Sequence, residues 1–285
     1  HATTSKLSTT SSSTTLPTVY HLGFRGMALH AICSLSESFH VTTSTTSSSP
    51  HAISAYYSPT HTRISSQSTT AREHGTTIEI TGLFNNYPVR KTYAINQSKR
   101  ITQKIITILQ SYALAHPWST FSLKLEGNHK TPLVSTPGLK SIKTATEIHT
   151  HDWSSFDYKN KVDLVTRLKV LRSTWVSLFG MGSVKSLVEF TVKDVLEDHS
   201  EDRVDVVGLV CKNEVSGNGR RSSGDRQFVS INGRPIINGM LNRSISEVFR
   251  KLNLNNSNVF PIFVLHVLMP YEYVDPNITQ DKSRV

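Results

Sequence analysis

An apolar run near the end of the chain limits the possible folds more than any other feature of the sequence. Residues Phe260 to Met269 are almost continuously apolar, and the preceding stretch 240–253 carries its apolar residues on one helical face. Strands that are apolar on both faces occur in covered sheets, and a helix between two strands gives a β-α-β unit. With another strand expected at 225–231, the sequence predicts such a unit. The run is too short to cross a bilayer and is interrupted by Pro261 and His266, so we expect no membrane partner.

Hydrophobic periodicity elsewhere predicts further elements of an α/β (α+β) fold. The expected strands cover 38–46, 75–80, 118–125, 184–195 and 203–212. The expected helices cover 27–36 and an amphipathic stretch that begins at Ser98 and ends before His116-Pro117. We interpret Asn85 to Arg90 as a turn closed by Pro88.

Polar and proline-containing segments suggest how the chain is divided. The Ser/Thr-rich segments 1–20 and 47–72 lack apolar periodicity, and we interpret them as surface loops. Residues 127–165 have few apolar clusters, so we place a domain boundary there and expect domains at 1–150 and 151–285. The chain begins at His1 rather than at a methionine, which suggests a fragment of a longer protein.

Composition narrows the function classes without choosing one. The 285 residues include 31 Lys and Arg against 21 Asp and Glu, a net charge of +10. This excess favours an anionic partner such as nucleic acid, nucleotide or acidic membrane, although it also fits a merely basic protein. The only cysteines, Cys33 and Cys211, argue against a disulfide scaffold or a cysteine-based zinc site and fit a reducing compartment. No histidine spacing indicates a metal site.

Gly23-Phe24-Arg25-Gly26 leads directly into the helix expected at 27–36. Glycines allow the backbone to approach a ligand closely, and the free N–H groups and dipole of a helix N-terminus favour phosphate. The stretch is therefore a candidate phosphate-binding loop, with an ordinary tight turn into a helix as the alternative.

Five motifs, in matching order, together resemble the MutL family of DNA mismatch-repair ATPases, within the gyrase and histidine-kinase (GHKL) superfamily. The five are His1 to Leu7, Gly23 to Leu29, Gly75-Thr76-Thr77 with Leu83-Phe84 and Pro88 to Arg90, Asp225 to Phe228 with Asn232 to Pro235, and Val274 to Ile278 with Asp281-Lys282. The Gly-rich loop Gly219 to Ser223 is most similar to the eukaryotic post-meiotic-segregation (PMS-type) branch.

The resemblance implies the C-terminal part of a GHKL-type ATPase α/β sandwich, with its ATP lid, at 1–150. It implies a transducer domain with a ribosomal-protein-like fold, incomplete at its C-terminus, at 151–285. The implied cofactor is ATP with Mg²⁺. Its implied contacts are the lid residues Thr4, Ser5 and Lys6, the phosphate-facing Gly23, Phe24, Arg25, Gly26 and Met27, Thr76 near the adenine, and Lys282 as the γ-phosphate sensor. Each contact has an alternative without nucleotide: residues 4–6 would form a free, flexible lid, Thr76 would be an ordinary strand threonine, and Lys282 would be a surface lysine.

The resemblance also implies that Arg220, Arg221, Arg226 and Arg234 line a DNA channel. Such residues would contact phosphates without reading sequence, so binding would fall steeply with salt. A solvated basic loop is the alternative for each. The implied partners are DNA, including mismatched DNA, a second MutL homologue in a heterodimer and MutS-type mismatch-recognition proteins, and the implied location is the nucleus.

The chain departs from the family pattern where catalysis would begin. The family's glutamate base, asparagine magnesium ligand and adenine-binding motif precede the lid and are not found in these residues. We therefore expect this polypeptide alone to bind and hydrolyse ATP poorly. Met27 replaces the family's glutamate and can neither complement the helix dipole nor hold Arg25. The alternatives are a catalytically silent MutL-like scaffold that pairs with a partner and DNA, and a ribosomal-type RNA-binding module.

Overall fold

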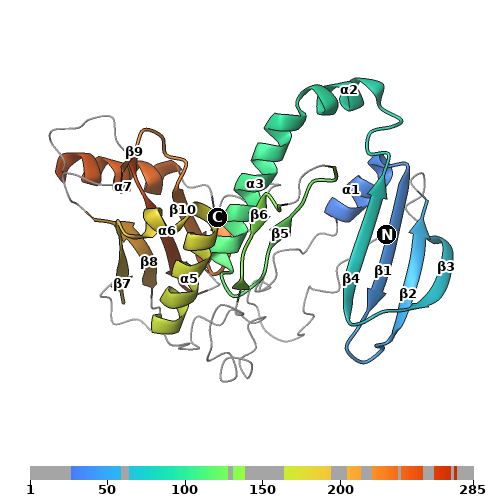
Figure 1. Cartoon of the computed structure of the whole chain (residues 1–285), viewed down its shortest axis with the longest axis horizontal. Helices are drawn as coiled ribbons and strands as arrows, with labels where there is room; N and C mark the ends of the chain where they lie inside the picture. The colour runs from blue at the N-terminus through green and yellow to red at the C-terminus, as the bar shows by residue number, and fades with distance from the viewer. Residues whose placement is uncertain are drawn as a thin grey trace. The chain divides into compact units, whose positions relative to one another are not determined.

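The computed structural model describes residues 27–58, 64–127, 131–138, 164–193, 204–212, 220–236, 239–252, 260–270 and 273–274. These residues form two compact units, and the first gives way to the second between Thr102 and Gln103 (Figure 1). Both helices and sheets are present, so the mixed α/β class predicted from the sequence is confirmed. None of the helices in these ranges is both long and apolar enough to span a membrane.

The first unit is built on a four-stranded antiparallel sheet with the strand order β3-β2-β1-β4. Helix α1 (Met27–Leu35) precedes the sheet. The strands are β1 (Ser38–Ser44), β2 (His51–Tyr57), β3 (Ile64–Ala71) and β4 (Gly75–Thr81). The predictions of a helix at 27–36 and of strands at 38–46 and 75–80 are therefore confirmed, with ends shifted by one or two residues.

The prediction of a surface loop at 47–72 is wrong, because β2 and β3 occupy most of that segment. Every residue of β3 is exposed, since the strand lies at the sheet edge and pairs with β2 alone. Only Ala52 and Ala55 of β2 are buried, and both are too small to produce a visible apolar pattern. Threonine suits a pleated surface as a β-branched residue, so a Ser/Thr-rich sequence can form strands when neighbours supply the hydrogen bonds.

Two helices follow β4, and the first was not predicted. Pro88 does not close a turn but begins α2 (Pro88–Asn96), where its fixed φ suits the first helical turn. Helix α3 (Ser98–Ala115) stops before His116-Pro117, as predicted. The boundary between the two compact units falls within α3.

The second unit contains a five-stranded sheet with the order β11-β10-β13-β8-β7. Strands β10 and β13 are parallel, and the other neighbouring pairs are antiparallel. The strands are β7 (Leu187–Val192), β8 (Asp205–Cys211), β10 (Gln227–Ile231), β11 (Arg234–Ile236) and β13 (Phe263–Leu268). Because helix α7 (Gly239–Leu252) lies between the parallel strands in sequence, the predicted β-α-β unit is confirmed.

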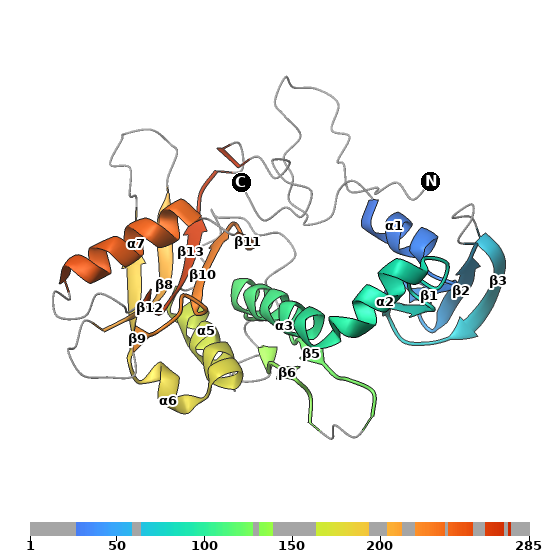
Figure 2. The same ribbon diagram turned by 90° about the horizontal axis from the view of Figure 1, so that it is seen from above.

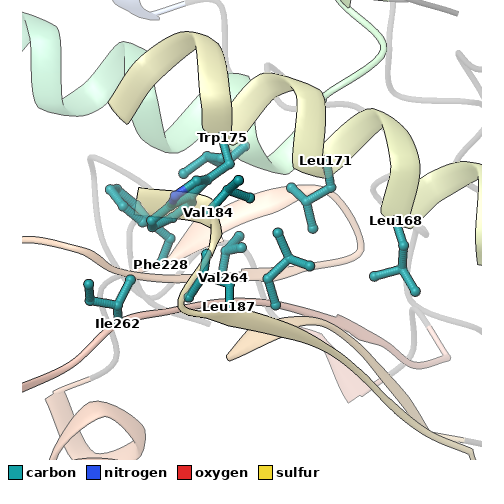
Figure 3. Packing of buried hydrophobic residues seen from close by; sticks show 10 residues of the cluster. Leu168, Leu171, Trp175, Val184, Leu187, Phe228, Ile262 and Val264 are labelled. Carbon is teal, nitrogen blue, oxygen red and sulfur yellow. The ribbon is translucent and has the colours of Figure 1, made fainter. Parts of the chain in front are cut away.

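Helices cover both faces of this sheet (Figure 2). On one face α5 (Leu164–Phe179) contributes Leu168, Leu171 and Trp175 to a core with strand residues such as Leu187 and Val264 (Figure 3). The buried Trp175 Nε1 donates a hydrogen bond of 3.0 Å to the hydroxyl of Ser183. On the other face, residues of α7 pack against Val229, Phe263 and Leu265. This double coverage explains why β13 is apolar on both sides.

Five short elements complete the fold, and some of them modify the sequence predictions. The strand expected at 184–195 starts only at Leu187, because α6 (Met181–Val184) precedes it. The strand expected at 118–125 is reduced to β5 (Ser122–Leu123), paired with β6 (Val134–Ser135). Strand β9 (Arg220–Arg221) pairs with β12 (Phe260–Pro261).

The boundary between the two compact units, which falls within α3, lies elsewhere than the domain boundary predicted near residue 150. Leu114, at the end of α3, belongs to the buried core that α5 forms in the second unit, so this half of the helix clusters with later residues. Domains 1–150 and 151–285 refer to the architecture implied by the resemblance, and they stay a prediction.

Candidate nucleic-acid interface

Most of the predicted nucleotide contacts lie outside the described residues. These are Thr4, Ser5, Lys6, Gly23, Phe24, Arg25, Gly26 and Lys282. Met27 is the first residue of α1, as expected of a residue that follows a phosphate-binding loop, but its side chain is also outside the described part. The nucleotide site therefore stays a prediction.

Thr76, predicted to lie near the adenine, is described and exposed on β4. Its hydroxyl forms a hydrogen bond of 2.8 Å with the hydroxyl of Thr43, its partner in the β1–β4 register. A cross-strand threonine pair of this kind is a normal feature of sheets. The contact agrees with the alternative of a strand threonine, and the contact with adenine stays a prediction.

Two of the arginines predicted to contact DNA, Arg221 and Arg226, lie at or beside the turn between β9 and β10. Arg221 Nε and Nη2 donate to the two carboxylate oxygens of Asp225, at 2.7 and 2.8 Å. The hydroxyl of Ser223 donates to the same carboxylate at 2.8 Å. Partial burial tends to raise the pKa of Asp225, but these hydrogen bonds outweigh it and hold the pKa below its ordinary value. The planar fork therefore fixes the Arg221 guanidinium at a partly exposed position.

Arg226 is held by an aromatic ring rather than by a carboxylate. Its guanidinium carbon lies 4.7 Å from the ring centroid of Phe179, at the C-terminal end of α5. Partial burial and the nearby positive charge of Arg221 lower the pKa of Arg226, while the charge of Asp225 opposes this shift. The β9–β10 turn therefore carries two oriented guanidinium groups. We call Arg221, Asp225, Arg226 and Phe179 the arginine turn.

Hydrogen bonds fix the arginine turn to the sheet and to α7. The side chain of Gln227 donates to the Ser246 hydroxyl on α7 at 3.1 Å and to the Pro261 carbonyl at 3.2 Å. The N–H of Phe263 donates to the carbonyl of Arg226 at 3.1 Å. The backbone of Arg220 pairs with Pro261 in the β9–β12 ladder, whereas its side chain lies outside the described part.

Arg234 differs from the expectation of a DNA contact, because only 6% of its surface is exposed. Burial lowers its pKa, and Tyr112 opposes the shift. Arg234 follows a tight hairpin turn, in which Asn232 and Gly233 have φ values of 47° and 78°. Asn-Gly is the preferred pair for such turns. The structure therefore gives the Asn-Gly-Arg motif a structural role and does not support a phosphate contact by Arg234.

A second group of basic residues is buried in the same unit. Burial lowers the pKa of His266 on β13 to about 3 and the pKa of Arg167 on α5 to about 10. Burial also lowers the pKa of His116, and the positive charge of Arg167 acts in the same direction. Trp118 contacts both His116 and Arg167 through its ring. Within the described ranges, no group of three or more His, Cys, Asp or Glu side chains could hold a metal ion.

Sequence reasoning missed two members of the arginine turn. Asp225 was recognised only as part of a motif, although its position four residues after Arg221 is a local signal for an ion pair. Phe179 gave no signal, since α5 was not predicted and the contact with Arg226 joins distant parts of the sequence.

Comparisons with known proteins relate the chain to DNA mismatch-repair proteins. Residues 177–285, which include the arginine turn, match the sequence model of the family "DNA mismatch repair protein, C-terminal domain". The chain is 28% identical to DNA mismatch repair protein PMS1 of Saccharomyces cerevisiae, covering 93% of this chain and 28% of the relative. It is also 28% identical to human mismatch repair endonuclease PMS2, covering 95% of this chain and 28% of the relative. The chain thus spans just over a quarter of the length of these relatives.

A solved structure shares the fold. The crystal structure of the N terminal domain of a DNA repair protein superposes with a TM-score of 0.69 at 29% sequence identity. The match covers 93% of this chain and 69% of the solved one.

Proposed function

This chain belongs to the MutL/PMS family of DNA mismatch-repair proteins, and from that premise we propose that its arginine turn binds the phosphate backbone of DNA during mismatch repair. The observation that carries this proposal is the fixed orientation of two guanidinium groups on one short turn, Arg221 by Asp225 and Arg226 by Phe179. Guanidinium groups match phosphate geometry, and contacts to phosphate position a protein on DNA without reading sequence. The net charge of +10 favours the same partner.

A salt titration tests this proposal. Binding of this chain to a fluorescein-labelled duplex is measured by anisotropy between 50 and 300 mM salt (roughly the range over which phosphate contacts are screened). Each lost phosphate contact lowers the slope of log K against log salt by about 0.9, so the double variant Arg221→Ala/Arg226→Ala lowers it by about 2. Arg172→Ala removes one positive charge from α5, where Arg172 lies 3.9 Å from Glu189, and leaves the slope unchanged. Equal slopes in wild type and double variant would contradict the proposal.

The parent protein, on the same premise, is an ATP-binding and ATP-hydrolysing MutL homologue whose nucleotide-driven closure clamps DNA. The support is the motif set in the sequence. Thr4, Ser5 and Lys6 would close over the triphosphate, Gly23 to Met27 would face the phosphates, Thr76 would lie near the adenine and Lys282 would sense the γ-phosphate. ATP, bound together with Mg²⁺, would supply the phosphoanhydride bond that is hydrolysed. This chain, which has no match to the family's glutamate base or asparagine ligand, turns over ATP hardly at all by itself.

ATP turnover by the full-length protein tests this part. Lys282→Ala slows hydrolysis, because the γ-phosphate loses a charged contact, whereas Lys251→Ala on the exposed surface of α7 leaves turnover unchanged. Unchanged turnover in Lys282→Ala would contradict the role of Lys282.

One observation favours a second candidate, a catalytically silent scaffold that pairs with a second MutL homologue and DNA. Met27 stands where the family has a glutamate, so the first turn of α1 has no acidic residue to complement its dipole. A scaffold binds DNA with the same salt slope but hydrolyses no ATP as a full-length protein. In either case we infer a heterodimer with a second MutL homologue, action with MutS-type proteins and a nuclear location, supported by the similarity to PMS-type proteins.

A further inference from the structure

Three side chains form a hydrogen-bonded relay across the first sheet, far in sequence from the arginine turn. His40 on β1 lies between Ser54 on β2 and Glu79 on β4. Its Nε2 atom is 2.7 Å from the Ser54 hydroxyl, and its Nδ1 atom is 2.9 Å from a carboxylate oxygen of Glu79. The relay therefore joins a hydroxyl, an imidazole and a carboxylate in that order, with one ring nitrogen for each neighbour.

The direction of the hydrogen bonds follows from the carboxylate. An ionised carboxylate can only accept a hydrogen bond, so Nδ1 of His40 carries the proton that is donated to Glu79. In the neutral ring, Nε2 then has a lone pair and accepts the hydroxyl proton of Ser54. This is the tautomer that a general base needs if it is to remove a proton from serine.

The imidazole ring is held in place by its neighbours. Its plane stacks on the ring of Tyr56, with centroids 4.1 Å apart and an interplanar angle of 10°. Only 15% of the His40 side chain is exposed, whereas 66% of the Glu79 side chain is exposed. Ser54 is partly exposed on the same polar face of the sheet. The base is therefore fixed, while the hydroxyl remains within reach of a small molecule.

A positive charge lines the same hollow as the relay. Arg72 Nη1 donates to the Thr42 carbonyl at 3.0 Å and to the Thr77 hydroxyl at 2.7 Å. Thr42 is the register partner of Ser54 across the β1–β2 ladder. Within the described part of this unit, the Nε and Nη2 groups of Arg72 make no hydrogen bond, so they are available to a bound oxygen atom. The three relay residues and Arg72 together line an open hollow of about 790 Å³.

We propose that Ser54, His40 and Glu79 form a nucleophile, a general base and an orienting carboxylate that hydrolyse short-chain carboxylic esters. Ser54 Oγ attacks the carbonyl carbon as its proton passes to His40 Nε2, and Arg72 donates to the oxygen that becomes negative. The bond to the alcohol oxygen breaks, and His40 returns the proton to that oxygen. Water then attacks the acyl-serine, gives its proton to His40 and releases the carboxylic acid with Ser54 restored.

The lining of the hollow defines the substrate class. Hydroxyl groups and charged groups dominate it, including Thr42, Ser68 and Thr70. A wide opening and a polar floor give no enclosure for a long acyl chain, and they suit a short acyl group on a polar alcohol. This activity is independent of DNA and of ATP, so it does not rest on the function proposed above.

Hydrolysis of p-nitrophenyl acetate by this chain tests the proposal. The wild type is expected to hydrolyse the ester with saturation kinetics, and Ser54→Ala or His40→Gln to lower kcat about 100-fold, the usual contribution of a positioned base. Ser66→Ala serves as the matched control, because Ser66 lies in the same sheet, on β3 opposite Tyr56, but does not line the hollow. Thermal melting shows whether each variant remains folded.

Covalent labelling separates catalysis from a structural role. A fluorophosphonate probe is expected to label Ser54 in the wild type, as shown by mass spectrometry of the peptide, and Glu79→Gln to slow labelling. Equal hydrolysis by wild type and Ser54→Ala, or labelling only at other residues, would show that the relay merely joins three strands.

Discussion

The two buried imidazoles of the second unit make its stability depend on pH well above the range in which carboxylates titrate. His266 is 1% exposed on the central strand β13, and burial lowers its pKa to about 3. His116 is also mostly buried, and its pKa is lowered by burial and by the positive charge of Arg167. The His266 ring is therefore neutral in the folded unit near pH 6.

The sign of the effect follows from the direction of these shifts. An unfolded chain protonates each imidazole near its ordinary pKa of about 6.5, whereas the folded unit resists protonation until the pH approaches the lowered pKa. For His266 the stabilisation is therefore complete above about pH 6.5 and is lost as the pH falls towards 3. This imidazole removes up to about 1.4 kcal/mol of unfolding free energy per pH unit in this window, a large part of the stability of an ordinary domain. The lowered pKa of His116 acts in the same direction.

Urea unfolding at several pH values between 7 and 5.5 measures this slope. Tryptophan fluorescence reports on the second unit, because Trp118 contacts His116 at 5.4 Å between ring centroids and Trp175 lies in the core. The variant His266→Phe keeps an aromatic ring without a titrating group, and it should lower the slope. As a control, replacing an exposed histidine of the first unit in His51→Gln should leave the slope unchanged. A wild-type slope near zero, or an equal slope in His266→Phe, would refute the reasoning.

Three further changes have effects that follow from single contacts. Gly208→Ala places a methyl group against the Val264 carbonyl across the β8–β13 ladder, and it should lower the urea-unfolding free energy by about 3 kcal/mol. Trp175→Ala leaves a large cavity in the core beneath α5, and it should cost about 3–5 kcal/mol in the same assay, whereas an effect below about 1 kcal/mol would contradict the packing. Asp225→Asn removes the charge that holds Arg221, so duplex DNA should bind several-fold more tightly at low salt, and weaker binding would show that the fork is needed to orient the guanidinium.

Elements of the fold were predictable where burial imposes a pattern on the sequence. Strand β13 is apolar on both faces because α5 and α7 cover both sides of its sheet, and that environment is visible as a continuous apolar run. Helix α7 carries its apolar face at helical spacing for the same reason. Strands β2 and β3 were not predictable in this way, because almost none of their side chains are buried.

Helix α5 shows a different kind of failure. Its core residues Leu168, Leu171 and Trp175 recur at helical spacing, but the helix has no acidic residue in its first turn and no basic residue in its last turn. Without charged residues that mark its ends, the apolar spacing alone did not show where a helix begins after the unassigned segment that precedes it. The Phe179 contact with Arg226 could not be predicted for the same reason.

The contacts of the site residues were predictable only where both partners lie close together in the sequence. The fork between Arg221 and Asp225 joins residues four apart, whereas the burial of Arg234 depends on how the hairpin packs against the rest of its unit. A basic residue in a family motif can therefore have a structural role that its sequence context does not reveal. The nucleotide contacts at 1–26 and at Lys282 remain predictions from the motifs alone.

The relay on the first sheet depends on register, and this sets a strict condition on the proposed hydrolysis. His40 faces Glu79 directly in the β1–β4 ladder, and Ser54 lies diagonally from His40, opposite Thr42 in the β1–β2 ladder. A shift of one residue in either ladder would turn every side chain of the moved strand to the other face of the sheet. The three groups come from strands that bury few side chains, among which Phe39 is the only large apolar one on β1, β2 and β4, so the hydrophobic pattern specifies this register weakly. The hydrogen bonds of the relay are then among the interactions that select it, and replacing His40 should loosen the pairing of β1 with β2, measurable as faster amide exchange in β2, as well as remove the base.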